Sequence, residues 1–282
     1  MGGIDWQQGA TPSTGGSALI GVSVTLSVLQ IFFVIARFYT RSLQHTQCGA
    51  DDYVMLVALT GSLAKAVIFI VLVEVAGFGH HVNDLAYPIR DISLMKKGFF
   101  VLELLDFPFT VTPAKISLLL FYVRIFYMRI LYTRKFQIIP YTIGALVLGL
   151  GITVFFETIF QCSPIEHGWN PNIQGTCVNQ STFYRAISPI NVLTGLMLLV
   201  LPIPLVWSLH ARRVQKVALT GVFLLSGLGT VVSVLRMAIW FTSPRAELND
   251  RTWFSIKLGI ISMAESAIIV IATCLEITFS EK

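Results

Sequence analysis

The stretch YVMLVALTGSLAKAVIFIVLVEV, residues 53–75, decides the class of fold. It is apolar along almost its whole length, and its charged side chains are Lys65 and Glu74. The hydrocarbon core of a bilayer is about 30 Å thick, so a helix that crosses it needs about 20 mostly apolar residues. Residues 53–75 meet both requirements, and the sequence therefore predicts a transmembrane helix here.

Six further stretches have a similar length and composition. They are residues 17–38, 98–125, 138–160, 184–209, 217–241 and 254–277. The strands of a membrane barrel would be shorter and would alternate apolar with polar residues, and these stretches do neither. The sequence therefore predicts an all-α fold, a bundle of seven transmembrane helices.

The composition of the whole 282-residue chain agrees with a multi-pass integral membrane protein. Hydrophobic residues make up 55% of it and charged residues 12%, about half the usual share in soluble domains, and the mean hydropathy is +0.74. Intrinsic disorder, a disulfide-stapled miniprotein and a nucleic-acid partner are disfavoured. We expect a disordered polar tail at 1–16, the membrane domain at 17–278 and a short tail at 279–282. The endoplasmic reticulum and the plasma membrane both remain possible locations.

The basic residues predict an orientation in the membrane. The net charge is +5, and two basic clusters, at 124–135 and 212–216, lie close to predicted span ends on the same side. Basic residues near span ends favour the cytoplasmic side. The sequence therefore predicts the N-terminus outside and the C-terminus in the cytoplasm.

The connector at 161–183 then faces the oxidising side of the membrane. It contains Cys162 and Cys177, for which we predict a disulfide bond. It also contains the sequon Asn179-Gln180-Ser181, so we predict N-glycosylation of Asn179.

Charged residues inside the predicted spans are expensive in a bilayer and mark function by default. At a rise of about 1.5 Å per residue, they separate into layers by depth. The outer third contains Glu74, Glu103, Asp106, Glu157, Arg236 and Lys257. Lys65 and Glu265 lie near the midplane and Lys115 lies somewhat below it. This distribution predicts a polar cavity that opens toward the outside.

Glu103 and Asp106 are three residues apart and so share one helix face. Two carboxylates in a cavity of low dielectric do not both ionise easily, so one is expected to keep its proton and to act as a general acid. The alternative is that both carboxylates form ion pairs with Arg236 and Lys257 and only hold helices together. The candidate catalytic residues are Glu103, Asp106, Glu157, Arg236 and Lys257.

Other polar patterns are given structural interpretations. Lys65, Lys115 and Glu265 are predicted to form one midplane polar network between helices. Asp51 and Asp52 precede a span, where carboxylates favour a helix start. Kinks are expected near the prolines at 108 and 113. The histidines and the aspartate at 80–84 match no strong zinc spacing, so no metal and no cofactor are predicted.

Several short motifs occur in a fixed order along the chain. They are Arg37-x-Tyr39-x-Arg41, Asp51-Asp52-Tyr53, Gly77-x-Gly79-x-His81, Lys115-Ile116-Ser117-Leu118, Tyr122-x-Arg124-Ile125-Phe126, Cys162-x-Pro164 with Trp169 and Cys177, Leu201-Pro202-Ile203-Pro204 with Trp207, and Glu265 before Cys274-Leu275. In this order they resemble the fungal rhodopsin-like family of integral membrane proteins, which includes the satratoxin-cluster type. The chain departs from the family pattern at Gly195, where an acid is frequent, and at Glu276, where proline is frequent.

The resemblance implies a seven-helix fungal membrane protein, with some members like surface receptors and others encoded in secondary-metabolite clusters. Retinal attachment is disfavoured because Lys257 lies near the outer end of the last span and Glu265 occupies its midplane. We predict a tailoring protein that binds a lipophilic polyketide or terpenoid and catalyses a cofactor-independent cyclisation or isomerisation. A receptor for a small lipophilic ligand, like a G-protein-coupled receptor, is the alternative. The sequence leaves the oligomeric state open.

Overall fold

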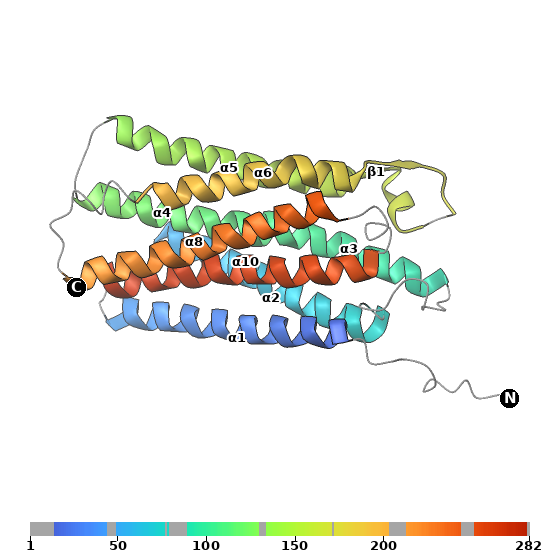
Figure 1. Ribbon diagram of the computed structural model, residues 1–282, viewed down its shortest axis with the longest axis horizontal. Coiled ribbons are helices and arrows are strands. Elements are labelled where there is room, and N and C mark those ends of the chain that lie inside the picture. The colour runs from blue at the N-terminus through green and yellow to red at the C-terminus, as the bar shows by residue number, and fades with distance from the viewer. Residues whose placement is uncertain are drawn as a thin grey trace.

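The computed structural model describes residues 14–43, 49–76, 78, 89–129, 134–170, 172–202, 213–243 and 251–280. These residues contain seven helical spans long and apolar enough to cross a membrane, which confirms the predicted fold class (Figure 1). Large apolar side chains such as Phe32, Ile35 and Leu224 are exposed on the outside of the bundle. An apolar exterior of this kind is what contact with lipid chains requires.

The helices that form the spans differ slightly from the predicted limits. They are α1 (Thr14–Leu43), α2 (Ala50–Ala76), α3 (Ile89–Asp106), α4 (Thr112–Arg129), α5 (Arg134–Phe160), α6 (Gln180–Val200), α8 (Arg213–Thr242) and α10 (Arg251–Ser280). α6 begins four residues before the predicted span, because the Asn179 side chain accepts from Thr182 N and caps the helix. Most of the predicted 1–16 tail and residues 203–209 of the fifth predicted span lie outside the described residues.

The third span joins α3 to α4 through a π-helical turn, η2 (Phe107–Val111), where the sequence predicts a kink. Thr112 N donates to Phe107 O, five residues back, and Thr110 Oγ1 donates to Leu105 O at 2.8 Å. Lys115 lies nine positions after Asp106, a spacing that in a regular α-helix would place the two side chains on opposite faces. The wider π turn reduces that separation, so one span directs both side chains into the bundle.

α10 is the central helix and packs against α1, α2, α4 and α8. α1 and α2 meet at one of its sides and α8 at another, while α5 lies at the edge against α4 and α6 (Figure 1). The apolar contacts near the start of α1 include Leu19, Phe69 and Met263, all buried. This arrangement buries most of α10 and brings its polar side chains into the interior.

A short hairpin closes one end of the bundle. It consists of β1 (Cys162–Ser163), the 3₁₀ turn η3 (Ile165–Gly168) and β2 (Thr176–Cys177), with Cys162 paired to Cys177 in register. The two cysteines form the predicted disulfide, which is therefore confirmed. α1 begins near this hairpin end and runs to the opposite end (Figure 1).

At the opposite end, a buried cluster of four charged side chains joins α1 to α2. Arg37 donates to Asp51 at 2.7 Å and to Asp52 at 2.8 Å, and Arg41 forms ion pairs with both carboxylates. Arg37 also donates to the Thr273 carbonyl of α10. Asp52 accepts from Gly49 N at 2.9 Å, in keeping with its predicted role at the helix start. We call Arg37, Arg41, Asp51 and Asp52 the Arg37 cluster.

Candidate functional site

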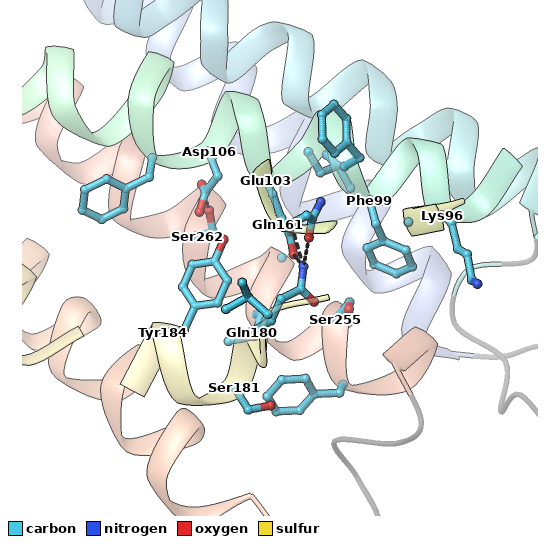
Figure 2. Close-up of a pocket in the computed structure, with 18 of the residues that line it drawn as sticks. Lys96, Phe99, Glu103, Asp106, Gln161, Gln180, Ser181, Tyr184, Ser255 and Ser262 are labelled. Atoms are coloured by element: carbon cyan, nitrogen blue, oxygen red, sulfur yellow. Dashed lines mark hydrogen bonds between the residues drawn. The ribbon is translucent and has the colours of Figure 1, made fainter. Parts of the chain in front are cut away.

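A cavity of about 820 Å³ lies between the helices at the hairpin end of the bundle. α2, α3, α6, α8, α10 and the hairpin all contribute to its wall. The sequence predicts a polar cavity, and the described cavity combines polar residues with a larger apolar surface. Much of the wall is apolar and aromatic, with Phe69, Phe99, Phe100, Phe107, Trp169, Trp240 and Phe254 among its residues. Glu103, Asp106, Tyr184 and Ser262 are among the polar residues that also line it (Figure 2).

The floor of the cavity is built on Asp106, the last residue of α3. Lys65 from α2 donates to Asp106 Oδ1 at 2.8 Å, and Arg236 from α8 donates to Oδ2 at 3.2 Å. Ser262 from α10 accepts from Lys65 at 2.8 Å and donates to Asp106. The Arg236 guanidinium also lies 5.7 Å from the centroid of the Phe107 ring, within range of a cation–π contact. Four spans thus meet at one carboxylate.

The same polar contacts continue deeper into the bundle through Glu265 on α10. Its carboxylate lies 3.3 Å from Arg236 Nη2 and accepts from Ser233 at 2.5 Å and from Asn191 at 3.1 Å. Asn191 in turn accepts from Lys115 Nζ at 2.7 Å. Since each buried charge has a charged or hydrogen-bonding partner, the network satisfies the requirement for ionisable groups in an apolar interior.

We call this set the cavity network. It consists of Lys65, Asp106, Lys115, Asn191, Arg236, Ser262 and Glu265. The sequence places Lys65, Lys115 and Glu265 in one midplane group and Asp106 and Arg236 in a separate outer group. In the structure, Asp106 and Arg236 connect the midplane residues to one another. The two predicted groups are therefore parts of one network.

Glu103 lies one helical turn from Asp106, nearer the mouth of the cavity. Gln180 Nε2 donates to its two carboxylate oxygens at 3.2 and 3.1 Å, and also to Gln161 (Figure 2). Glu103 thus accepts from a neutral amide, and Asp106 accepts from the two cations Lys65 and Arg236. The two carboxylates share a face of α3, as the sequence predicts, but they have different environments.

The five candidate catalytic residues occupy three kinds of position. Glu103, Asp106 and Arg236 line the cavity. Glu157 is half-buried on α5 and is not among the lining residues, and neither of its carboxylate oxygens has a hydrogen-bond partner among the described residues. Lys257 is exposed on α10 and is not among the lining residues. Asp106 forms ion pairs with Lys65 and with Arg236, and the pair with Arg236 is one that the structural alternative predicts.

Several neutral residues of the site give no charge signal in the sequence. Asn191 links Lys115 to Glu265, and Ser262 links Lys65 to Asp106. The Tyr184 ring stacks on Trp240, with the ring centroids 5.0 Å apart, and both line the cavity. Their positions on helix faces could have been inferred only with knowledge of which spans are neighbours.

The described residues contain no group of three or more His, Cys, Asp or Glu side chains placed to hold a metal ion. The histidines and the aspartate considered at 80–84 lie outside the described residues. Asn179, the predicted glycosylation site, is exposed and also borders the cavity. A glycan there would stand at the rim of the cavity.

Comparisons with known proteins agree with this architecture. The family model for the fungal rhodopsin domain matches residues 36–280. The "Polyenoic acids biosynthesis gene cluster protein Ba17b" of Metarhizium anisopliae is 27% identical over 280 residues, which cover 95% of this chain and 74% of that protein. No solved structure matches.

Two further relatives match over shorter regions. The "Satratoxin biosynthesis SC1 cluster protein 4" of Stachybotrys chartarum is 25% identical over 53% of this chain and 54% of its own length. The "Receptor GIN3" of Arthrobotrys oligospora is 30% identical over 61% of this chain and 42% of its own length. The chain thus matches about half or less of each of these two proteins.

Proposed function

The chain belongs to the fungal rhodopsin domain family of multi-pass membrane proteins, and from this premise we propose that it is a tailoring protein of fungal secondary metabolism. It binds a lipophilic polyketide or terpenoid intermediate in the cavity at the hairpin end. There it carries out acid–base chemistry, such as a cyclisation or an isomerisation, without a cofactor. Two relatives named as biosynthesis cluster proteins support the metabolic assignment.

The observation that carries this proposal is a large, mainly apolar cavity with ionisable groups on its wall. Its volume of about 820 Å³ falls within the range of roughly 300–1,000 Å³ typical of small-molecule sites. Aromatic side chains supply apolar surface for a lipophilic skeleton, and a few polar groups fix its orientation. Such a site suits a hydrophobic intermediate that reaches the protein through the bilayer.

Asp106 and Glu103 have different surroundings, and we assign them different roles. Asp106 is held by Lys65 and Arg236, so its charge is compensated and its role is to position these cations. Glu103 lines the cavity and accepts from the Gln180 amide at 3.2 and 3.1 Å, and a carboxyl group at this position is suited to exchange a proton with a bound molecule. Arg236 lines the cavity beside them and is suited to stabilise negative charge that develops on the substrate.

A turnover assay tests the proposal. Microsomes containing the protein are incubated with lipophilic polyketide and terpenoid intermediates, and the products are followed by mass spectrometry. We expect conversion of one intermediate, and we expect Glu103→Gln to slow it by about 10²-fold or more because positioned proton transfer contributes at least that factor. Glu74→Gln is the matched control, because Glu74 is exposed on α2. No conversion of any intermediate by the wild type would contradict the assignment.

A receptor for a small lipophilic molecule is the second candidate. The cavity network favours it in one respect, because the contacts extend from Asp106 at the floor to Lys115 on α4, deeper in the bundle. A relative named as a receptor is 30% identical over 180 residues. Ligand-dependent association with a G-protein α subunit, in the absence of any turnover, would favour the receptor.

A further inference from the structure

We infer that the molecule bound in the cavity is an uncharged lipophile whose polar end carries hydroxyl groups, rather than a carboxylic acid or an amine. This inference rests on the proposed function, because it specifies the chemical class of the ligand for the same cavity. It follows from two independent features of the site. The charges of the site balance, and its accessible charged groups accept hydrogen bonds rather than donate them.

The charges of the cavity network and of Glu103 balance. Three cations, Lys65, Lys115 and Arg236, stand against three carboxylates, Glu103, Asp106 and Glu265. Lys96 also borders the cavity, but its amine points away from Glu103 and Asp106 (Figure 2). A charged ligand would add a net charge to a region within the membrane, at a high cost in desolvation. An uncharged ligand avoids this cost.

The polar groups of the floor offer acceptors more readily than donors. Lys65 directs its ammonium to Asp106 Oδ1 and to the Ser262 hydroxyl and carbonyl, and its side chain is only 1% exposed. The Asp106 side chain is 25% exposed, against 11% for Arg236. The most accessible charged group of the floor is therefore a hydrogen-bond acceptor.

Glu103 adds a second carboxylate on the same side of the cavity. Side chains three residues apart on a helix have Cβ atoms about 5–6 Å apart, so Glu103 and Asp106 form a pair of acceptors along α3 (Figure 2). Two neighbouring hydroxyl groups on a flexible or cyclic skeleton can donate to such a pair. A ligand carboxylate would instead add a third carboxylate beside Glu103 and Asp106, where Lys65 and Arg236 are already paired with Asp106.

Three probes with the same hydrocarbon chain test the inference. They are 1,2-dodecanediol, dodecanoate and dodecylamine, each titrated into the full-length protein in nanodiscs at neutral pH while the unfolding temperature is measured. We expect the diol to raise the unfolding temperature most. A larger increase with dodecanoate or dodecylamine would overturn the inference, and so would the absence of an effect from all three probes.

The Glu103→Gln variant separates recognition at the cavity from partition into the lipid, because partition is the same for both proteins. Loss of one charged acceptor should weaken binding of the diol by about tenfold and should improve binding of dodecanoate relative to the diol. Glu74→Gln, on the exposed face of α2, should change neither. Equal affinities in the wild type and in Glu103→Gln would overturn the inference.

An error in the ligand class can be distinguished from an error in the proposed function. If the wild type converts an intermediate that carries an essential carboxylate, the ligand class is wrong and the tailoring function stands. If the diol binds as expected but no intermediate is converted, the ligand class stands and the proposed chemistry is wrong.

Discussion

The Arg37 cluster and the cavity network are two solutions to the same problem, the burial of charge inside a bundle of membrane helices. In the Arg37 cluster, two arginines face two aspartates, and none of these side chains is more than 4% exposed. In the cavity network, the Asp106 side chain is 25% exposed and faces an open cavity. The first arrangement is closed on itself, whereas the second presents part of its charge to a space that a ligand can enter.

This difference teaches that charge within a membrane segment does not by itself indicate chemistry. The Arg37 cluster joins α1, α2 and α10, and its buried arginines are paired with its buried aspartates. The cavity network also joins helices, but it borders a site as well. Accessibility from a cavity separates a structural role from a functional one, and the following predictions test that separation.

The largest expected effect is on the Arg37 cluster. Arg37→Met leaves Asp51 and Asp52 buried with less compensation, so we expect a loss of about 3–5 kcal/mol in the free energy of unfolding. Unfolding in mild detergent, together with the yield of folded protein, measures the loss. Arg124→Met is the matched control, because the Arg124 side chain is 37% exposed and lies 3.5 Å from Asp51. A loss in the control as large as that in Arg37→Met would contradict the closed-cluster interpretation.

The hairpin that closes the cavity end should respond differently. Replacement of both Cys162 and Cys177 by serine removes a bond that closes a loop across 15 positions, at an expected cost of about 3 kcal/mol. We expect the hairpin to become sensitive to protease and the cavity to bind its ligand more weakly, because both cysteines line the cavity. The control, Cys274→Ala, alters a buried cysteine of α10 and should leave the hairpin protected. Unchanged ligand binding in the double variant would show that the hairpin does not shape the site.

The π-helical turn at 107–111 follows Asp106 directly, so its position affects the cavity network. A substitution that displaces the turn tests this dependence. Gly61 of α2 allows close approach of this turn, since an added Cβ would lie 2.4 Å from the Phe109 carbonyl oxygen. We expect Gly61→Ala to cost about 1–3 kcal/mol, measured by thermal unfolding, and to weaken ligand binding through a shift of Asp106. Gly149→Ala, where nothing lies within 4 Å of the added atom, should be nearly neutral. Equal stability of the two variants would contradict the close contact.

The smallest expected effect concerns the orientation of the two regions in the membrane. If the hairpin end faces outward, as the sequence predicts, Asn179 can carry a glycan. Asn179→Gln should then abolish a gel shift that glycosidase also removes, with a change in stability of only about 1 kcal/mol from the lost helix cap. Ser181→Ala removes the same sequon without changing the cap and should also abolish the gel shift. Labelling of Cys48 from outside intact cells would contradict this orientation.

The fold was largely predictable because a membrane span is a property of one segment. Length and hydropathy identify residues 53–75 without reference to any other part of the chain, and the span at 50–75 agrees. Helix limits were less predictable, because helices continue past the apolar region. The third span, for example, runs over Ser93–Arg124 and includes Lys96 and Lys97 before the predicted start at 98.

The site was less predictable because it depends on which helices are neighbours. The spacing of Glu103 and Asp106 is enough to place them on one face, and their depths are enough to predict a cavity near one end of the bundle. No spacing indicates that Asp106 meets Lys65, or that Asn191 joins Lys115 to Glu265. The interpretation of Asp51 and Asp52 as a helix start also missed Arg37, since local sequence does not show that α1 passes beside them.

The central claim is that the cavity lined by Glu103, Asp106 and Arg236 serves chemistry while the Arg37 cluster serves the fold. The most direct test is to measure two quantities, the yield of folded protein and the turnover per folded molecule, for Glu103→Gln and Arg37→Met. We predict that Glu103→Gln folds like the wild type and loses turnover, whereas Arg37→Met folds poorly and its folded fraction keeps turnover. A Glu103→Gln protein that folds normally and converts substrate at the wild-type rate would contradict the claim.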